Sequence, residues 1–309
     1  MKSTIFSATA ASVLAAVASG ALAVPVEKRA VNATPPTVTQ VLQFALTLEH
    51  LESTFYNQGL EQFDADAFEQ AGFPDWVRGR FVQIAQHEAT HVTTLENALG
   101  NNSFPACNYS FPVTDPVSFA TLGMTLEGVG ASAYLGSAGN LVSEPAVLQV
   151  AGSILPMEAR HNGWISASVM KQAPWSSSFE TALDPNQVFT LASTFITSCP
   201  STTPQLPFTT FPSLTFEGTP TPGQVSTLDF NVTSSSNSST NGTLSVAFLV
   251  GRNQTFVPLS ANNSVTIPAE LQGMVYAVVT NSDTNATDAT TVAGPAILQF
   301  PFNSNASNF

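Results

Sequence analysis

The sequence contains two Glu-x-x-His pairs, and each pair could hold a metal ion. Glu88 precedes His91 by three residues, and Glu158 precedes His161 by the same spacing. Residues three apart lie on one face of an α-helix, so each pair would present a carboxylate and an imidazole to the same neighbour. The repeated pattern therefore indicates a metal site built from helices.

Two further glutamates precede these pairs, each with a tyrosine on the same helical stripe. Glu49 lies seven residues before Tyr56, and Glu127 lies seven residues before Tyr134. Two carboxylate-bridged metal ions in a four-helix bundle take one Glu from each of two helices and a Glu-x-x-His from each of the others. The chain supplies the complete set, Glu49, Glu88, His91, Glu127, Glu158 and His161.

Three stretches carry a resemblance to the ferritin-like superfamily: Leu48 to Glu52, Gln86 to His91 and Met157 to His161. The chain is particularly similar to secreted ferritin-like proteins of fungi, of the stress-response or late sexual development type, and to plant desiccation-related proteins. The resemblance covers about half of the chain, roughly residues 37–196. It says little about the remainder.

The resemblance implies a role for each ligand. Glu88 and Glu158 would bridge two metal ions, Glu49 and Glu127 would each bind one ion from the side, and each histidine would bind one ion. Carboxylates dominate and no thiolate is present, so iron is the first choice and manganese the alternative. Such centres in the superfamily react with dioxygen or peroxide, which implies metal oxidation with iron or peroxide disproportionation with manganese.

A second function stays open beside this one. The chain could be a non-enzymatic secreted or cell-wall protein, structural or adhesive, in which the metal site is structural or empty. Its C-terminal part would then attach to glycans or cell-wall partners. An enzymatic role is therefore left uncertain by the sequence.

Several neighbours of the ligands have two readings. Tyr56 and Tyr134 would either hydrogen-bond a ligand carboxylate or be ordinary core tyrosines. Glu52 competes with Glu49 for the ligand position on the first helix, but the tyrosine spacing favours Glu49 and leaves Glu52 supporting the site or at the surface. His50 and His87 are expected to point elsewhere, as structural or exposed residues.

The N-terminus has the pattern of a secretory leader. Residues 1–23 are expected to be a signal peptide, and residues 24–29 a short propeptide that ends at the dibasic pair Lys28 and Arg29. The protein would be secreted, extracellular or in the cell wall, with no membrane anchor in the mature chain. Removal of residues 1–29 changes the net charge from −13 to −15, so a nucleic-acid partner is disfavoured.

An oxidising compartment fits the cysteine and sequon content. Cys107 and Cys199 are the only cysteines and are expected to form a disulfide. In the chain-entropy model its long loop gives roughly 4 to 5 kcal/mol of stabilisation. Glycosylation is expected at several Asn-x-Ser/Thr sequons, which occur at Asn32, Asn101, Asn108, Asn231, Asn237, Asn241, Asn253, Asn262, Asn285 and Asn305.

The helices that must position these ligands can be placed from periodicity, caps and breakers. We expect helices over about residues 38–56, 74–99, 116–136, 145–172 and 185–196, the first of them ending at Asn57 to Gly59. Residues 100–114 would form the long crossover of a ferritin-like bundle, which occupies residues 37–199 and includes the fifth helix.

After Cys199 the sequence becomes rich in Ser, Thr, Pro and Asn and contains short alternating apolar runs. These runs predict strands separated by polar turns. We expect a linker over residues 200–210 and a small immunoglobulin-like β-sandwich over residues 211–303. The predicted fold class is α+β with two domains.

Overall fold

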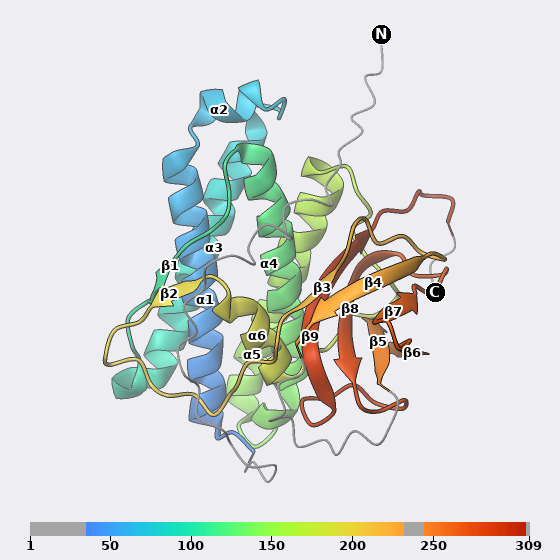
Figure 1. The fold of residues 1–309 in the computed structure, drawn as a ribbon. Coiled ribbons are helices and arrows are strands. Elements are labelled where there is room, and N and C mark those ends of the chain that lie inside the picture. Colours follow the sequence, from blue (N-terminus) through green and yellow to red (C-terminus); the bar gives the residue numbers. More distant parts are fainter. Residues whose placement is uncertain (1–34, 232–243, 307–309) are drawn as a thin grey trace.

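Helices come first and strands second along the chain. The computed structural model describes residues 35–231 and 244–306, and Figure 1 shows the helical part beside the strand-rich part, with helix α6 between them. The α+β class predicted from the sequence is confirmed in this form. The predicted signal peptide (1–23), the propeptide (24–29) and the sequons at Asn32, Asn237 and Asn241 lie outside the described residues.

The N-terminal part is built from long helices that run side by side (Figure 1). Helix α1 contacts both α3 and α4, and α4 contacts α5. A short helix α2 joins the first pair. The bounds are α1 Val38–Gln62, α2 Ala65–Gln70, α3 Trp76–Leu99, α4 Pro116–Ser137 and α5 Pro145–Trp164.

The helix starts follow local capping chemistry. Thr37 and Gln40 form a reciprocal capping box at the start of α1, and Asp115 does the same with Ser118 at the start of α4, where Pro116 occupies the first turn. Caps of this kind satisfy backbone N–H groups that have no partner inside the helix, and proline is tolerated there because it has no N–H to satisfy. The starts are therefore fixed by a few residues each.

Helix α1 does not end at Gly59, as the sequence suggested, but continues to Gln62. A Cβ atom at Gly59 would lie 2.1 Å from Cε2 of Phe119 on α4. Glycine is needed here because the aromatic ring occupies the space of a side chain, not because the helix terminates. The predicted end was wrong for this reason.

Helix α4 is the central helix of the molecule, since nearly all of its residues are buried. A helix that is apolar all round must be covered on every side. Its glycines permit this coverage at short range: a Cβ at Gly136 would lie 1.8 Å from the carbonyl oxygen of Leu183. The helix thus contacts α1, α5 and α6.

The end of the helical part differs in detail from the prediction. Helix α5 contains Pro156 and continues as a π-helical segment over Ile165–Val169. Helix α6 covers Pro185–Ser193, and residues Ile196–Ser198 form strand β2 instead of a last helical turn. Strand β2 pairs antiparallel with β1, Asn108–Tyr109, in the crossover between α3 and α4.

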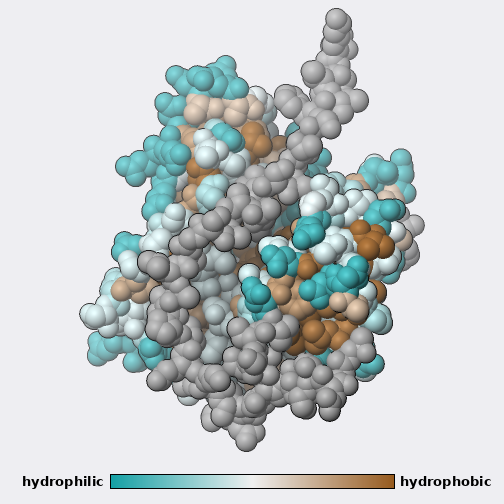
Figure 2. Space-filling view, in the orientation of Figure 1, coloured by the Kyte–Doolittle hydropathy of each residue, from teal (hydrophilic) through white to brown (hydrophobic). Residues whose placement is uncertain are grey.

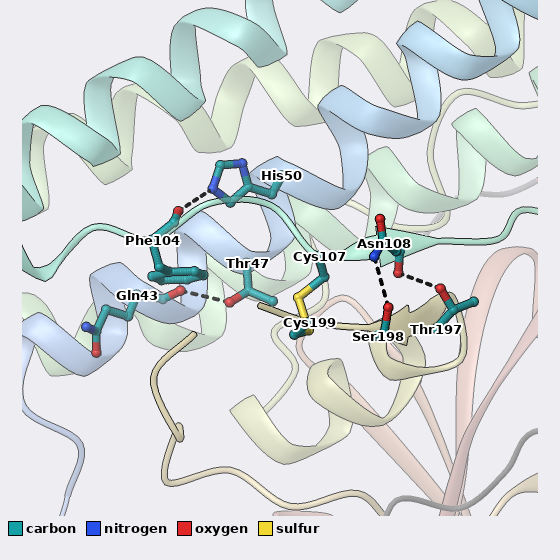
Figure 3. The surroundings of a disulfide bond; sticks show 9 residues. All are labelled: Gln43, Thr47, His50, Phe104, Cys107, Asn108, Thr197, Ser198 and Cys199. Carbon is teal, nitrogen blue, oxygen red and sulfur yellow. Dashed lines mark hydrogen bonds between the residues drawn. A yellow bond between two sulfur atoms is a disulfide. The ribbon is translucent and has the colours of Figure 1, made fainter. Parts of the chain in front are cut away.

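The predicted disulfide between Cys107 and Cys199 is present beside this small sheet (Figure 3). The same region is anchored to α1, because Nε2 of His50 lies 2.9 Å from the carbonyl oxygen of Phe104. Asn108 and Ser198 also share a side-chain hydrogen bond of 2.9 Å. The crossover is therefore attached at several points to the bundle and to the segment after α6.

The C-terminal part contains two antiparallel sheets that share an apolar core, which includes Val246 and Val275. The first sheet has the order β3-β4-β7 and the second β6-β5-β8-β9. Immunoglobulin-like topology stays a prediction. The strands are β3 Leu214–Phe216, β4 Val225–Phe230, β5 Ser245–Val250, β6 Asn253–Pro258, β7 Ser264–Thr266, β8 Gly273–Thr280 and β9 Thr291–Phe300.

The helical and strand-rich parts are in direct contact. The hydroxyl of Tyr276 on β8 donates to the carbonyl of Gly128 on α4 at 3.1 Å and lies 2.9 Å from the hydroxyl of Ser132. The segment predicted as a linker also packs on the bundle, since the rings of Phe208 and Phe44 are 4.6 Å apart. One buried apolar cluster includes residues of both parts.

The surface shows no membrane-spanning element in the described residues. No helix in residues 35–231 and 244–306 is long and apolar enough to cross a bilayer. Hydrophilic side chains dominate the end of the bundle around α2 (Figure 2).

Candidate metal centre

Four helices each bring one glutamate to the middle of the bundle. Glu49 comes from α1, Glu88 from α3, Glu127 from α4 and Glu158 from α5, and each is 0% exposed. Burial of four carboxylates is costly unless a cation or hydrogen-bond donors compensate their charge. Their shared location therefore calls for a compensating group.

The six predicted ligand residues fall into two overlapping groups. One contains Glu49 and His91 and the other contains Glu127 and His161, whereas Glu88 and Glu158 belong to both. Within each group the candidate ligand atoms all lie within 4.8 Å of one another. The structure thus creates two neighbouring positions that share two carboxylates.

Both histidines direct Nδ1 at the carboxylates. Nδ1 of His91 lies 3.1 Å from Glu88 Oε2 and 3.3 Å from an oxygen of Glu49 and of Glu158. Nδ1 of His161 lies 2.9 Å from Glu127 Oε2 and 3.2 Å from Glu88 Oε1. An imidazole nitrogen among carboxylate oxygens is a suitable donor set for one metal ion at each position.

The two tyrosines bond to ligand carboxylates, as one of their predicted roles required, but their partners are crossed. Tyr56 donates to Glu127 Oε1 and Tyr134 donates to Glu49 Oε1, each at 2.5 Å. Tyr56 therefore holds the glutamate of α4, and Tyr134 holds the glutamate of α1. Each carboxylate is oriented by the opposite half of the bundle.

Several buried carboxylate oxygens lack a well-aligned hydrogen-bond donor. Glu49 Oε2, Glu88 Oε1 and both oxygens of Glu158 are buried and accept no well-aligned hydrogen bond, although all but Glu158 Oε2 face a histidine Nδ1 at 3.2 to 3.3 Å. A buried polar atom without a partner costs of order 1 to 3 kcal/mol, and more for a charged group. These incompletely satisfied oxygens belong to residues of the two ligand groups, so the donor set fits a pair of cations.

Charge balance supports the same fit. Burial, together with neighbouring carboxylates, raises the pKa values of Glu49, Glu127 and Glu158 well above the ordinary range. Burial works against ionisation of Glu88 too, but hydrogen bonds from His161 and His91 lower its pKa to about 2. Without a cation the cluster holds protons, and two divalent ions would replace them with charge equal to that of four carboxylates.

The pKa of His91 is raised by the same carboxylates. Burial lowers its pKa, but hydrogen bonds to Glu158, Glu49 and Glu88 outweigh burial and raise it to about 12. A protonated imidazole is thus the local counter-ion when no metal ion is bound. Metal binding at this position must displace that proton.

Glu52 is not a surface residue and belongs to neither ligand group. It is 4% exposed, and burial together with the charge of Glu158 raises its pKa well above the ordinary range. A Cβ at Gly130 would lie 2.9 Å from Glu52 Oε1 and 2.8 Å from Glu158 Oε2. Glu52 is therefore a buried carboxyl beside Glu158, and Glu49, which the tyrosine spacing favoured, is the glutamate of α1 that belongs to a ligand group.

His87 contacts the site, which the sequence reasoning missed. Its side chain is exposed, yet its Nδ1 lies 3.0 Å from Nε2 of His161, and the two rings stack with centroids 5.2 Å apart. If Nδ1 of His161 binds a metal ion, its Nε2 carries the proton and can donate it to Nδ1 of His87. The only sequence signal was the position of His87 next to Glu88.

The described sequons all have exposed asparagines, as glycosylation would require. Glycosylation itself stays a prediction. These residues are Asn101, Asn108, Asn231, Asn253, Asn262, Asn285 and Asn305.

Comparison with known proteins agrees with the geometry of the bundle. Residues 37–171 match the family model described as a ferritin-like domain. Protein rds1 of Schizosaccharomyces pombe (strain 972) is 30% identical over 237 residues, which are 76% of this chain and 56% of that protein. The chain therefore spans little more than half the length of this curated relative. All six clustered residues lie within the range that matches the ferritin-like domain model, so the similarity covers the part of the chain that forms the cluster.

Proposed function

We propose that this chain is a secreted fungal ferritin-like protein that binds two metal ions and oxidises them while consuming dioxygen or peroxide, in stress or development. The observation that supports it is the pair of overlapping ligand groups that share Glu88 and Glu158. Carboxylate oxygens with imidazole nitrogens favour iron, with manganese as the alternative. The electrons for reduction of the oxidant come from the bound metal ions.

Each residue has a defined task in this proposal. Glu88 and Glu158 would be shared by the two ions, Glu49 and His91 would complete one position, and two further residues would complete the second. Tyr56 and Tyr134 hold Glu127 and Glu49 in place by hydrogen bonds. The apolar residues around the cluster exclude bulk water. The two residues that would complete the second position are Glu127 and His161.

The edge of the site at the histidines is where a small oxidant would approach. The side chain of His91 is 11% exposed and that of His161 is 6% exposed, whereas the glutamates are fully covered. A molecule as small as dioxygen or hydrogen peroxide needs only a narrow path. The exposure of the imidazoles supports access for such a substrate rather than for a large one.

A structural role is the alternative that the burial of the carboxylates favours. A metal pair enclosed by α1, α3, α4 and α5 would hold the bundle together even without turnover. In that case the strand-rich part would carry the function by attaching to glycans or cell-wall partners. The disulfide and the exposed sequon asparagines support a secreted location for either version.

The test compares oxidant consumption by the metal-loaded protein and by a variant without bridging carboxylates. The secreted wild type is loaded with Fe(II) without oxygen, then exposed to dioxygen or hydrogen peroxide in an oxygen electrode and a spectrophotometer. We expect oxidation of about two iron ions per chain, faster than for free iron, and lost in Glu88→Gln with Glu158→Gln. Peroxide disproportionation by the manganese form is measured in parallel. Site-dependent metal with no oxidant consumption would favour the structural role.

A further inference from the structure

An apolar pocket lies beside the metal centre between α1, α3, α4 and α5. Its volume is about 220 Å³, which exceeds the roughly 150 Å³ of a dry protein cavity that binds benzene or xenon. Exposed Ala98, Ala146 and Val150 line its outer side, and buried Leu95 and Ala133 line its interior. The pocket thus opens between α3 and α5.

Tyr134 connects this pocket to the metal centre. The residue lines the pocket, and its hydroxyl is hydrogen-bonded to Glu49 Oε1. A molecule in the pocket is therefore separated from a ligand of the metal centre by a single side chain. This proximity distinguishes the pocket from a packing defect elsewhere in the bundle.

The lining chemistry restricts the occupant. No charged residue lines the pocket, and its polar side chains are Thr94, Tyr134 and Ser137. The hydroxyl of Thr94 already donates to the carbonyl of Thr90, and that of Tyr134 donates to Glu49. A charged or strongly hydrated molecule would lose its water without gaining partners, which disfavours its binding.

We propose that this pocket is a binding site for small, uncharged, apolar molecules next to the metal centre. Its relation to catalysis depends on the proposed function, but binding itself does not. Dioxygen and a small hydrocarbon share the required chemistry, and the experiment below separates them. If a second copy of the chain or another segment of it fills the pocket instead, such a molecule will not bind.

The test uses xenon and toluene as probes of the secreted wild type and of two variants on α5. Ala151 lines the pocket, so Ala151→Leu fills it, whereas Ser153→Leu adds the same side chain at an exposed position of the same helix. We expect xenon density in crystals of the wild type and of Ser153→Leu, and its loss in Ala151→Leu. Toluene should raise Tm by about 2 °C only where the pocket is open.

Ala45→Leu, which fills the same pocket from α1, serves if Ala151→Leu does not fold. If the variant with the filled pocket is oxidised several-fold more slowly than the wild type by dioxygen but at the same rate by peroxide, the pocket is assigned to dioxygen. An unchanged dioxygen rate with loss of toluene binding would assign it to a hydrocarbon. Absence of both probes from the wild type would overturn the proposal, whereas a protein without metal that still binds xenon would overturn only the proposed function.

Discussion

At the scale of residues, the centre consists of acids that support one another across the bundle. The two bridging candidates belong to both ligand groups, and the tyrosines bond to the glutamate of the opposite helix. Support from the opposite half means that a change on one helix affects a ligand on another. The glutamates of α1 and α4 are therefore each held by a tyrosine of the other helix.

Tyr134→Phe should weaken binding of one metal ion. Loss of its hydroxyl leaves Glu49 Oε1 buried without its donor, and removal of such a support commonly costs about 10-fold or more in metal affinity. Competition with a chelator measures the effect. In double variants the change should be coupled to Glu49→Gln and additive with Glu127→Gln. Coupling to Glu127→Gln instead would contradict the crossed arrangement.

His87→Ala should weaken only the position that contains His161. The imidazole of His87 supports His161 from outside, whereas the remaining histidine, His50, is bonded to the carbonyl of Phe104 and does not support His91. We expect about a 10-fold loss of affinity for one ion and none for the other. Gln86→Ala, at the exposed neighbouring position, is the matched control. An equal loss for both ions would show that His87 acts through the fold.

The clustering of the six candidate ligand residues could be predicted because their spacing lies within single helices. Glu88 and His91 share a face whatever the rest of the chain does. The crossing of the tyrosines and the contact between His87 and His161 depend on how two helices are rotated against each other. Such a rotation leaves no periodic signal in one helix.

At the scale of elements, short-range contacts decide details that periodicity does not reveal. Gly59 suggested a helix end but instead admits the ring of Phe119. Strands β1 and β2 have two and three residues, too few for an alternating pattern. The long helices were predictable from capping residues and apolar stripes, and these small elements were not.

The N-terminus of helix α6, whose N-cap residue is Asp184, is also capped by a carboxylate of the strand-rich part. The carboxylate of Asp288 accepts hydrogen bonds from the backbone N–H groups of Asn186 and Gln187, at 3.0 and 3.3 Å. Burial, with a smaller contribution from Asp184, raises its pKa to about 7. The folded state therefore holds a proton between about pH 4 and 7 that the unfolded chain has released.

This proton predicts a pH dependence of stability. As pH rises through this window, the free energy of unfolding should fall in the wild type, because the buried carboxyl must ionise. Asp288→Asn should remove this contribution to the pH dependence. The Tm of the variant minus the Tm of the wild type should therefore be larger at pH 8 than at pH 5. Differential scanning calorimetry measures it, with exposed Asp283→Asn as control. A constant difference would contradict the shifted pKa.

At the scale of the whole molecule, the strand-rich part is anchored on the helix that carries Glu127. Tyr276 bonds to the backbone of α4 at Gly128, and the glycine leaves room for Met274, whose Cε would lie 2.2 Å from a Cβ there. The predicted linker segment also covers α1 through Phe208. The change in amino-acid composition showed where the strand-rich part begins, but it gave no sign that the two parts would share a core.

The disulfide should stabilise the whole molecule, but metal binding should not depend on it. Replacement of Cys107 and Cys199 by serine releases the crossover from the segment after α6, at a cost of roughly 4 kcal/mol in the chain-entropy model. We expect Tm to fall by about 10 °C while metal content stays unchanged, as measured by calorimetry and elemental mass spectrometry. Loss of metal from a variant that is still folded would contradict this separation.

The most direct test of the dinuclear centre is metal content by elemental mass spectrometry, on protein secreted and purified without chelators. The wild type should contain about two iron or manganese ions per chain. Glu88→Ala should contain almost none, because Glu88 belongs to both ligand groups, and Glu49→Ala should keep about one. Equal metal content in all three proteins, or none in the wild type, would contradict the account.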